Sequence, residues 1–191
     1  MKKKAIASAV SLMLVLLLAG CGNDGGGTDA ADKNLTGPSA DWKTHYETMD
    51  SMVTDTDLIV KGKVTGHSEE LRNDVVFTRQ NVEVVTVIKS DSDNPPEEIT
   101  VLQTGGSKDG VVTEAFPEAP LLETGETYLL FLEHTDEGHY LVGGGYQGVA
   151  EIDDESISFI CDFDNITREM EKIPASEIET EIAAIAEKAQ Q

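Results

Sequence analysis

The sequence of 191 residues is poor in basic side chains: 14 Lys and Arg stand against 36 Asp and Glu, for a formal net charge of −22 at pH 7. Nucleic-acid-binding proteins need a basic surface to meet the phosphate backbone, so this composition argues against that class. An anionic membrane surface would also repel the chain. The simplest interpretation of the charge is solubility, and the alternative is cation binding.

Long hydrophobic runs are also lacking. The longest mainly apolar stretch covers residues 5–19, which is shorter than the roughly 20 residues that a membrane-spanning helix needs. Three lysines at positions 2–4 precede this stretch, and two small residues end it. This arrangement is typical of a secretory signal peptide, so residues 1–20 are predicted to be cleaved off.

The signal segment ends in Leu18-Ala19-Gly20-Cys21, which resembles the lipobox of bacterial lipoproteins. The resemblance implies cleavage after Gly20 and transfer of a diacylglyceryl group to the sulfur of Cys21. Two or more acyl chains hold a protein stably, at about 0.8 kcal/mol per buried CH2, so a lipid anchor on the extracytoplasmic face of the cell membrane is expected. Cleavage removes three lysines and no acidic residue, which changes the net charge from −22 to −25. The alternatives are an ordinary secreted protein and a retained membrane helix.

Cysteine is scarce too, since only Cys21 and Cys161 occur. If Cys21 carries the lipid, Cys161 has no partner within the chain and no intramolecular disulfide is expected. Cys161 ends an apolar segment and is predicted to be a small buried hydrophobe. A catalytic thiolate is disfavoured there, because Asp162 and Asp164 stand beside it.

Residues 21–40 contain almost nothing to bury, so we expect a flexible tether that starts at the lipidated cysteine. Residues 41–191 are enough for one domain with its own core. Helical spacing predicts a helix over residues 41–53, capped by Asp41. A capping box of Ser176 and Glu179 predicts a C-terminal helix. The apolar face of this second helix is formed by Ile178, Ile182, Ile185 and Ala189.

The segments between the two helices have the pattern of short strands and turns. Strands are expected at residues 58–66, 75–89, 98–104, 111–112, 127–133, 139–142, 148–152 and 156–161. Gly62 and Gly66 predict a sharp bend in the first strand, and Asn73-Asp74 predicts a turn. The segment 127–133 is apolar on both faces and should be the most buried strand. Strands at such regular intervals predict a sandwich or a closed barrel.

The order of these strands resembles the netrin and tissue-inhibitor-of-metalloproteinase type of OB-like barrel. The similarity rests on residues 56–64, 82–89, 99–101 and 122–132, and it covers roughly residues 55–160. It implies a mainly β fold, a small OB-like antiparallel barrel with an N-terminal and a C-terminal flanking helix. In the inhibitor branch, a disulfide-bonded N-terminal cysteine with a free amine chelates the protease zinc. Cys21 departs from that pattern, so inhibition of proteases is not expected to carry over.

His134 and His139 flank a four-residue loop and suggest a metal site. Pairing across a hairpin would place both imidazoles on one side, within reach of a transition metal, and Asp136 or Glu133 could add an oxygen ligand. The alternative is two polar residues at an exposed turn. Clusters of Asp, Glu and Asn that could bind calcium, or be solvated turns, occur at residues 91–98, 153–155 and 162–165.

The sequence contains no G-x-S-x-G, no H-E-x-x-H and no phosphate-binding loop. We therefore expect a non-enzymatic binding or interaction module without a cofactor. Its partners would be the membrane, through the lipid, and an envelope protein or a small ligand. OB-like barrels bind ligands on one exposed face with adjoining loops, and the loops after Gly105 and around Tyr146 are candidates. The alternative function is a divalent-metal-binding envelope protein.

Overall fold

The structure is a computed structural model that describes residues 44–152, 156–160 and 165–189. The chain divides into a unit of residues 1–35 and a unit of residues 36–191, and all described residues belong to the second. The signal peptide, the cleavage site at Gly20, the lipid on Cys21 and most of the tether were predicted for residues outside this description. Cys161 and the acidic cluster at residues 153–155 also lie outside it.

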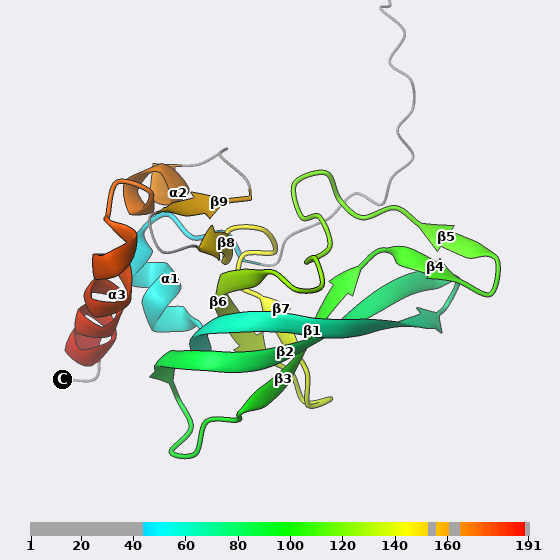
Figure 1. Cartoon of the computed structure of the whole chain (residues 1–191), viewed down its shortest axis with the longest axis horizontal. Coiled ribbons are helices and arrows are strands. Elements are labelled where there is room, and N and C mark those ends of the chain that lie inside the picture. The colour runs from blue at the N-terminus through cyan, green and yellow to red at the C-terminus, as the bar shows by residue number, and fades with distance from the viewer. Residues whose placement is uncertain (1–43, 153–155, 161–164, 190–191) are drawn as a thin grey trace, which may run out of the picture. The chain divides into compact units, whose positions relative to one another are not determined.

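Five strands close into a barrel (Figure 1). In order around the barrel they are β1 (Leu58–Arg72), β2 (Val75–Ser90), β3 (Glu98–Thr104), β7 (Tyr140–Val142) and β6 (Thr127–His134), which pairs back with β1. The prediction of a mainly β, OB-like barrel with flanking helices is confirmed. One detail differs from the antiparallel barrel that was expected, because β3 and β7 run parallel.

The first two strands form a long, bent hairpin. Its turn is Asn73-Asp74, as predicted, and both residues have positive φ angles, 49° and 64°, as a tight hairpin turn requires. The register between β1 and β2 shifts at three places, two of which lie at Gly62 and Gly66. A Cβ atom on Gly62 would lie 2.5 Å from Val82 Cγ1, so glycine leaves room there for the side chain of Val82.

Apolar side chains collect in two clusters, one on each side of the barrel wall. The cluster inside the barrel includes Leu58, Val60, Val64, Val82, Ile99, Val101, Tyr128, Leu130 and Leu132. The outer cluster includes Ile59, Leu129 and Phe131, which alternate with these residues along the same strands. Residues Leu129 to Leu132 of β6 are fully buried, so the prediction that this segment is buried on both faces is confirmed.

The outer cluster is covered by α1 (Met49–Asp55), α2 (Asn165–Met170), α3 (Ala175–Ala189) and the hairpin of β8 (Val149–Ile152) and β9 (Ile157–Phe159). Figure 1 shows α1 and α3 side by side at one end of the barrel. The hairpin of β8 and β9 was predicted, whereas α2 was not. Among the described helices, none is long and apolar enough to cross a membrane.

The N-terminal helix is shorter than predicted. It begins at Met49, because Thr48 is the N-cap: its hydroxyl accepts a hydrogen bond from the N–H of Ser51 at 3.1 Å. The expected cap, Asp41, lies outside the described residues. Tyr46, which was assigned to the helix, precedes it in non-helical backbone.

The C-terminal helix also differs from the prediction at its ends. It begins at Ala175, so Ser176 lies in the first turn and is not the N-cap. The helix buries Ile178, Ile182 and Ile185 as expected. Ala189 is exposed, and Ala186 completes the buried face in its place.

A second, two-stranded sheet projects beside the tip of the long hairpin (Figure 1). It consists of β4 (Gly106–Lys108) and β5 (Val111–Thr113), where a single short strand was expected. The connection from β5 to β6, residues 114–126, then returns along the outside of the barrel. This connection forms one wall of the pocket described next.

Candidate functional site

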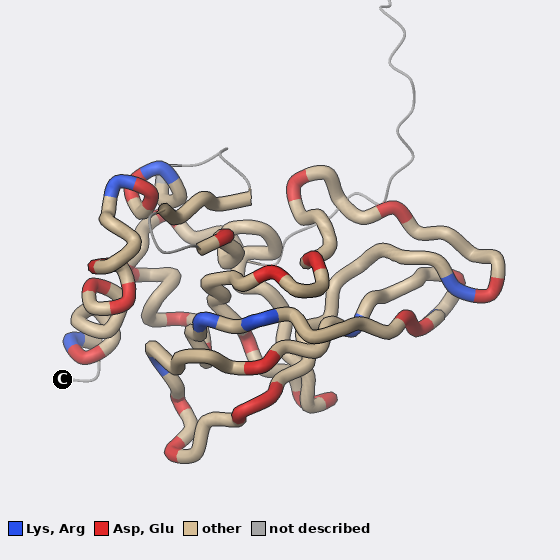
Figure 2. Tube along the Cα trace, viewed as in Figure 1, with Lys and Arg blue, Asp and Glu red and all other residues tan. Residues whose placement is uncertain are grey.

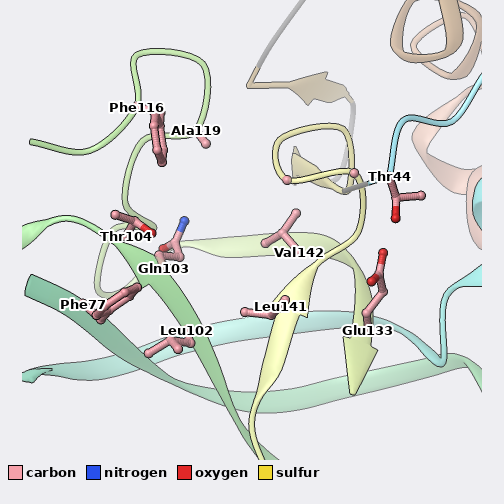
Figure 3. Close-up of a pocket in the computed structure, with 12 residues that line it drawn as sticks. Thr44, Phe77, Leu102, Gln103, Thr104, Phe116, Ala119, Glu133, Leu141 and Val142 are labelled. Atoms are coloured by element: carbon pink, nitrogen blue, oxygen red, sulfur yellow. The ribbon is translucent and has the colours of Figure 1, made fainter. Parts of the chain in front are cut away.

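A pocket of about 360 Å³ lies on the outer side of β2, β3 and β7 (Figure 3). Phe77, Leu102 and Leu141, one from each of these strands, lie in a row along its floor. Phe116 and Ala119, from the connection between β5 and β6, form the opposite wall. This part of the pocket is therefore lined by apolar side chains.

The other end of the pocket is polar. Glu133 lies opposite Leu141 in the pairing of β6 with β7, and its carboxylate points towards Thr44 (Figure 3). The phenol of Tyr46 donates a hydrogen bond to Glu133 Oε1 at 2.9 Å. Burial, and next the hydrogen bond to this carboxylate, raise the pKa of Tyr46. The phenol therefore stays protonated and remains a donor at neutral pH.

Tyr46 is held in place by the side chain of Gln147, which lies 101 residues further along the chain. Gln147 is fully buried, and its Oε1 accepts a hydrogen bond from the backbone N–H of Tyr46 at 2.8 Å. Its Nε2 donates to the carbonyl of Tyr46 at 2.9 Å. The amide thus satisfies both backbone polar groups of Tyr46, as a neighbouring strand would. Thr44, two residues earlier, lies at the rim of the pocket.

The turn that carries Gln147 is inserted between β7 and β8. On either side of the turn, the N–H of Gly143 donates to the carbonyl of Phe131 and the N–H of Phe131 donates to the carbonyl of Gly148, each at 2.9 Å. Gly144 has a φ of +63°, and a Cβ atom there would collide with the Gln147 side chain. The bend expected at the three glycines is therefore observed, and two of them, Gly144 and Gly145, line the pocket.

The opposite wall is fixed by Gln103 of β3. Its Oε1 accepts a hydrogen bond from the N–H of Leu122 at 2.9 Å, and its Nε2 donates to the carbonyl of Pro120 at 3.0 Å. Gln80 of β2 donates to the carbonyl of Leu122 at 3.1 Å. The connection between β5 and β6 is therefore attached to the barrel by buried or part-buried amides.

A charged cluster continues the same face of the barrel. Glu70 lies opposite Phe77 in the pairing of β1 with β2, so both side chains share the outer side. Glu70 pairs with Arg72 at 2.5 Å and with Arg79 at 2.6 Å, and Arg72 also pairs with Glu137 at 2.9 Å. Burial works against the charged form of Glu70, but the two arginines outweigh it and hold its pKa below the usual range.

The two histidines proposed as metal ligands do not pair with each other. His134 lies opposite Tyr140, and their rings meet edge to face at 5.1 Å. His139 instead lies opposite Thr135, whose N–H donates a hydrogen bond to the carbonyl of His139 at 2.9 Å. The expected pairing was therefore wrong by one residue, which changes the side that a strand residue faces.

His139 is 4% exposed, and its Nδ1 lies 4.0 Å from Glu137 Oε2. His134 is exposed, and Asp136 lies between the two histidines in the loop. Among the described residues, no group of three or more His, Cys, Asp or Glu side chains is placed to hold a metal ion. The metal site thus remains a sequence-based prediction that no cluster in the described part of the chain supports.

The two loops singled out from the sequence both contribute to the pocket, through Phe116 and Ala119 and through Gly144 and Gly145. The floor was missed. A signal for it existed, because Phe77 is apolar, whereas Arg79, Asn81 and Glu83 that follow it on the outer side of β2 are polar. The partners of Glu133, by contrast, could not be found from sequence spacing.

Comparison of the chain with models of protein families finds no match, and a search of curated proteins finds none either. The geometry of the pocket is therefore the basis for the function proposed below.

Proposed function

We propose that the protein is an extracytoplasmic lipoprotein, anchored in the cell membrane through Cys21, that acts as a non-enzymatic binding module for a small ligand. The ligand site is the pocket on the outer side of β2, β3 and β7. The observation that carries the proposal is an apolar floor between two walls that a buried and a part-buried amide hold in place. The signal segment and the lipobox support the location.

The size and position of the pocket favour a small ligand. Its volume of about 360 Å³ lies within the roughly 300–1,000 Å³ of small-molecule sites. Stable protein interfaces are broader, with about 800 Å² buried on each partner. Phe77 of β2 and Leu102 of β3 belong to the face that OB-like barrels use for their ligands. Walls that are already ordered also lower the entropic cost of binding.

The side chains of the pocket favour binding over catalysis. In the lining that the structure describes, Glu133 is the titratable residue, and Tyr46 already donates to it. Gln103 is engaged in holding the loop. The raised pKa of Tyr46 keeps its proton on the phenol, so acid–base or nucleophilic catalysis would need another reactive group within hydrogen-bond reach of Glu133.

The test uses the full mature chain with Cys21→Ser, which lacks only the lipid, and a neutral apolar probe, N-phenyl-1-naphthylamine. We expect saturable binding that Leu141→Glu weakens about tenfold or more, because it places a charge on the apolar floor. Val112→Glu is the matched control, since Val112 is an apolar strand residue that is 70% exposed, against 40% for Leu141, and lies outside the pocket.

Equal binding by the Leu141→Glu and Val112→Glu variants, or no saturable binding by the parent chain, would overturn the proposed site. The location is tested separately, by mass spectrometry of the wild-type chain. An unmodified Cys21 in a chain recovered from the medium would contradict the membrane anchor.

A further inference from the structure

We propose that the ligand of this pocket is a small amphipathic cation, an aromatic or branched apolar body that bears an amine, and that Glu133 binds its charge. This inference rests on the proposed function and names the chemical class of the ligand. Three observations carry it: the state of the Glu133 carboxylate, the way in which that carboxylate is positioned, and the distribution of charge around the pocket.

The first observation is a carboxylate that lacks a cationic partner. Glu133 lies at the polar end of an otherwise apolar floor, next to Leu141 (Figure 3). A carboxylate offers about four acceptor sites, and the phenol of Tyr46 uses one of them. Among the described residues, no Lys, Arg or His side chain forms an ion pair with Glu133. An ammonium group would supply the missing charge-assisted hydrogen bonds.

The second observation is that hydrogen bonds within the protein hold the carboxylate in place. Tyr46 is 3% exposed, and Gln147 holds both of its backbone polar groups. The phenol therefore presents its proton to Glu133 from a fixed place. An ion pair formed with a fixed carboxylate loses less side-chain entropy than one between two mobile surface groups.

The third observation is the surrounding charge. The chain carries a net charge of −22, and Figure 2 shows acidic residues on strands, loops and helices in the described part of the chain. Such a field attracts cations and repels anions. Arg72 and Arg79, the arginines of the neighbouring cluster, are paired with Glu70 and Glu137. An anionic amphiphile such as a fatty acid would therefore meet Glu133 without a compensating cation.

The test is a calorimetric titration of the Cys21→Ser mature chain with three probes of nearly equal shape: 2-phenylethylamine, 2-phenylethanol and 3-phenylpropanoate. We expect the amine to bind about tenfold more tightly than the alcohol, and the carboxylate to show no saturable binding. In the Glu133→Gln variant, the affinity for the amine should fall about tenfold, to that of the alcohol, while binding of the alcohol is unchanged.

Two further variants define the role of Glu133. Glu126→Gln makes the same change of charge at an exposed position just before β6 and should leave all affinities unchanged. Tyr46→Phe removes the hydroxyl that positions the carboxylate, and it should weaken amine binding by less than Glu133→Gln does. If Glu133→Gln does not fold, the order of the three probes on the parent chain still decides the question.

The inference about charge and the proposed function fail in different ways. If the amine and the alcohol bind equally, and Leu141→Glu abolishes both, the pocket binds ligands but the cation is wrong. Tighter binding of the carboxylate than of the amine also contradicts the cation. If neither the amine, the alcohol nor the naphthylamine probe binds, the pocket itself is not a ligand site.

Discussion

The outer side of the barrel wall consists of two regions with different covers. Over β6, Leu129 and Phe131 are fully buried beneath helices. Over β3 and β7, Leu102 is 9% exposed and Leu141 is 40% exposed, and both line the pocket. The apolar residues over β6 are thus inaccessible, whereas over β3 and β7 Leu141 remains accessible and Leu102 keeps a small exposed area at the pocket. In this open region, over β3 and β7, a ligand can contact apolar side chains without displacing a helix.

The difference arises from how each cover is attached. The helix α3 covers its region with three isoleucines, Ile178, Ile182 and Ile185, so the contact is apolar and closely packed. The connection between β5 and β6 is attached through the polar side chain of Gln103, which binds backbone groups of the connection. Hydrogen bonds of this kind fix a loop without filling the space beneath it.

The largest expected effect tests whether the two regions differ in stability. Phe131→Ala should lower the free energy of unfolding by about 3–5 kcal/mol, because it leaves a cavity under the helices. Leu141→Ala should lower it by less than about 1 kcal/mol, because its side chain is partly exposed already. Urea denaturation of both variants measures the difference. Similar losses in the two variants would show that the open region belongs to the core after all.

The second effect tests the attachment of the N-terminal segment. Gln147→Leu should lower the free energy of unfolding by about 1–3 kcal/mol, because it removes the hydrogen bonds to two backbone groups of Tyr46. Ligand affinity should fall as well, because Tyr46 and Thr44 lose their place at the pocket. Urea denaturation and the naphthylamine titration measure the two consequences. A stable variant with intact affinity would mean that the segment is held by other contacts.

The strands could be predicted because their signals are local. In β2, buried Val76 and Val82 fall at even positions, as a strand with one inner face requires. The turn at Asn73-Asp74 uses residue types that tolerate positive φ angles. The pairing of His134 was missed by one residue, because a loop's closing hydrogen bond is not encoded in the spacing of the histidines.

The start of the first helix was missed although a local signal exists, because Thr48 and Ser51 form a capping box, and a distant residue also acts on the segment before it. Tyr46 fits the helical spacing, but it is taken out of the helix by Gln147, which lies 101 residues further along the chain. The pocket floor was missed for a similar reason, because its residues are far apart in the sequence. Phe77, Leu102 and Leu141 become neighbours only when β3 pairs with β2 and then, in parallel, with β7.

The smallest effect concerns His139, which lies just before β7 and is buried beside charged side chains. Burial lowers its pKa below the usual value of 6.5; Glu137 and Glu70 oppose this shift, and Arg79 and Arg72 add to it. When the pH falls below about 6.5, the unfolded chain therefore takes up the proton before the folded chain does, and stability is lost. Urea midpoints measured from about pH 7.5 to about pH 5 should fall less steeply for His139→Leu than for the parent chain. Because a single proton is involved, the difference in slope is smaller than either effect above.

Identical slopes would mean that solvent reaches the imidazole, and the open region would then extend across the charged cluster.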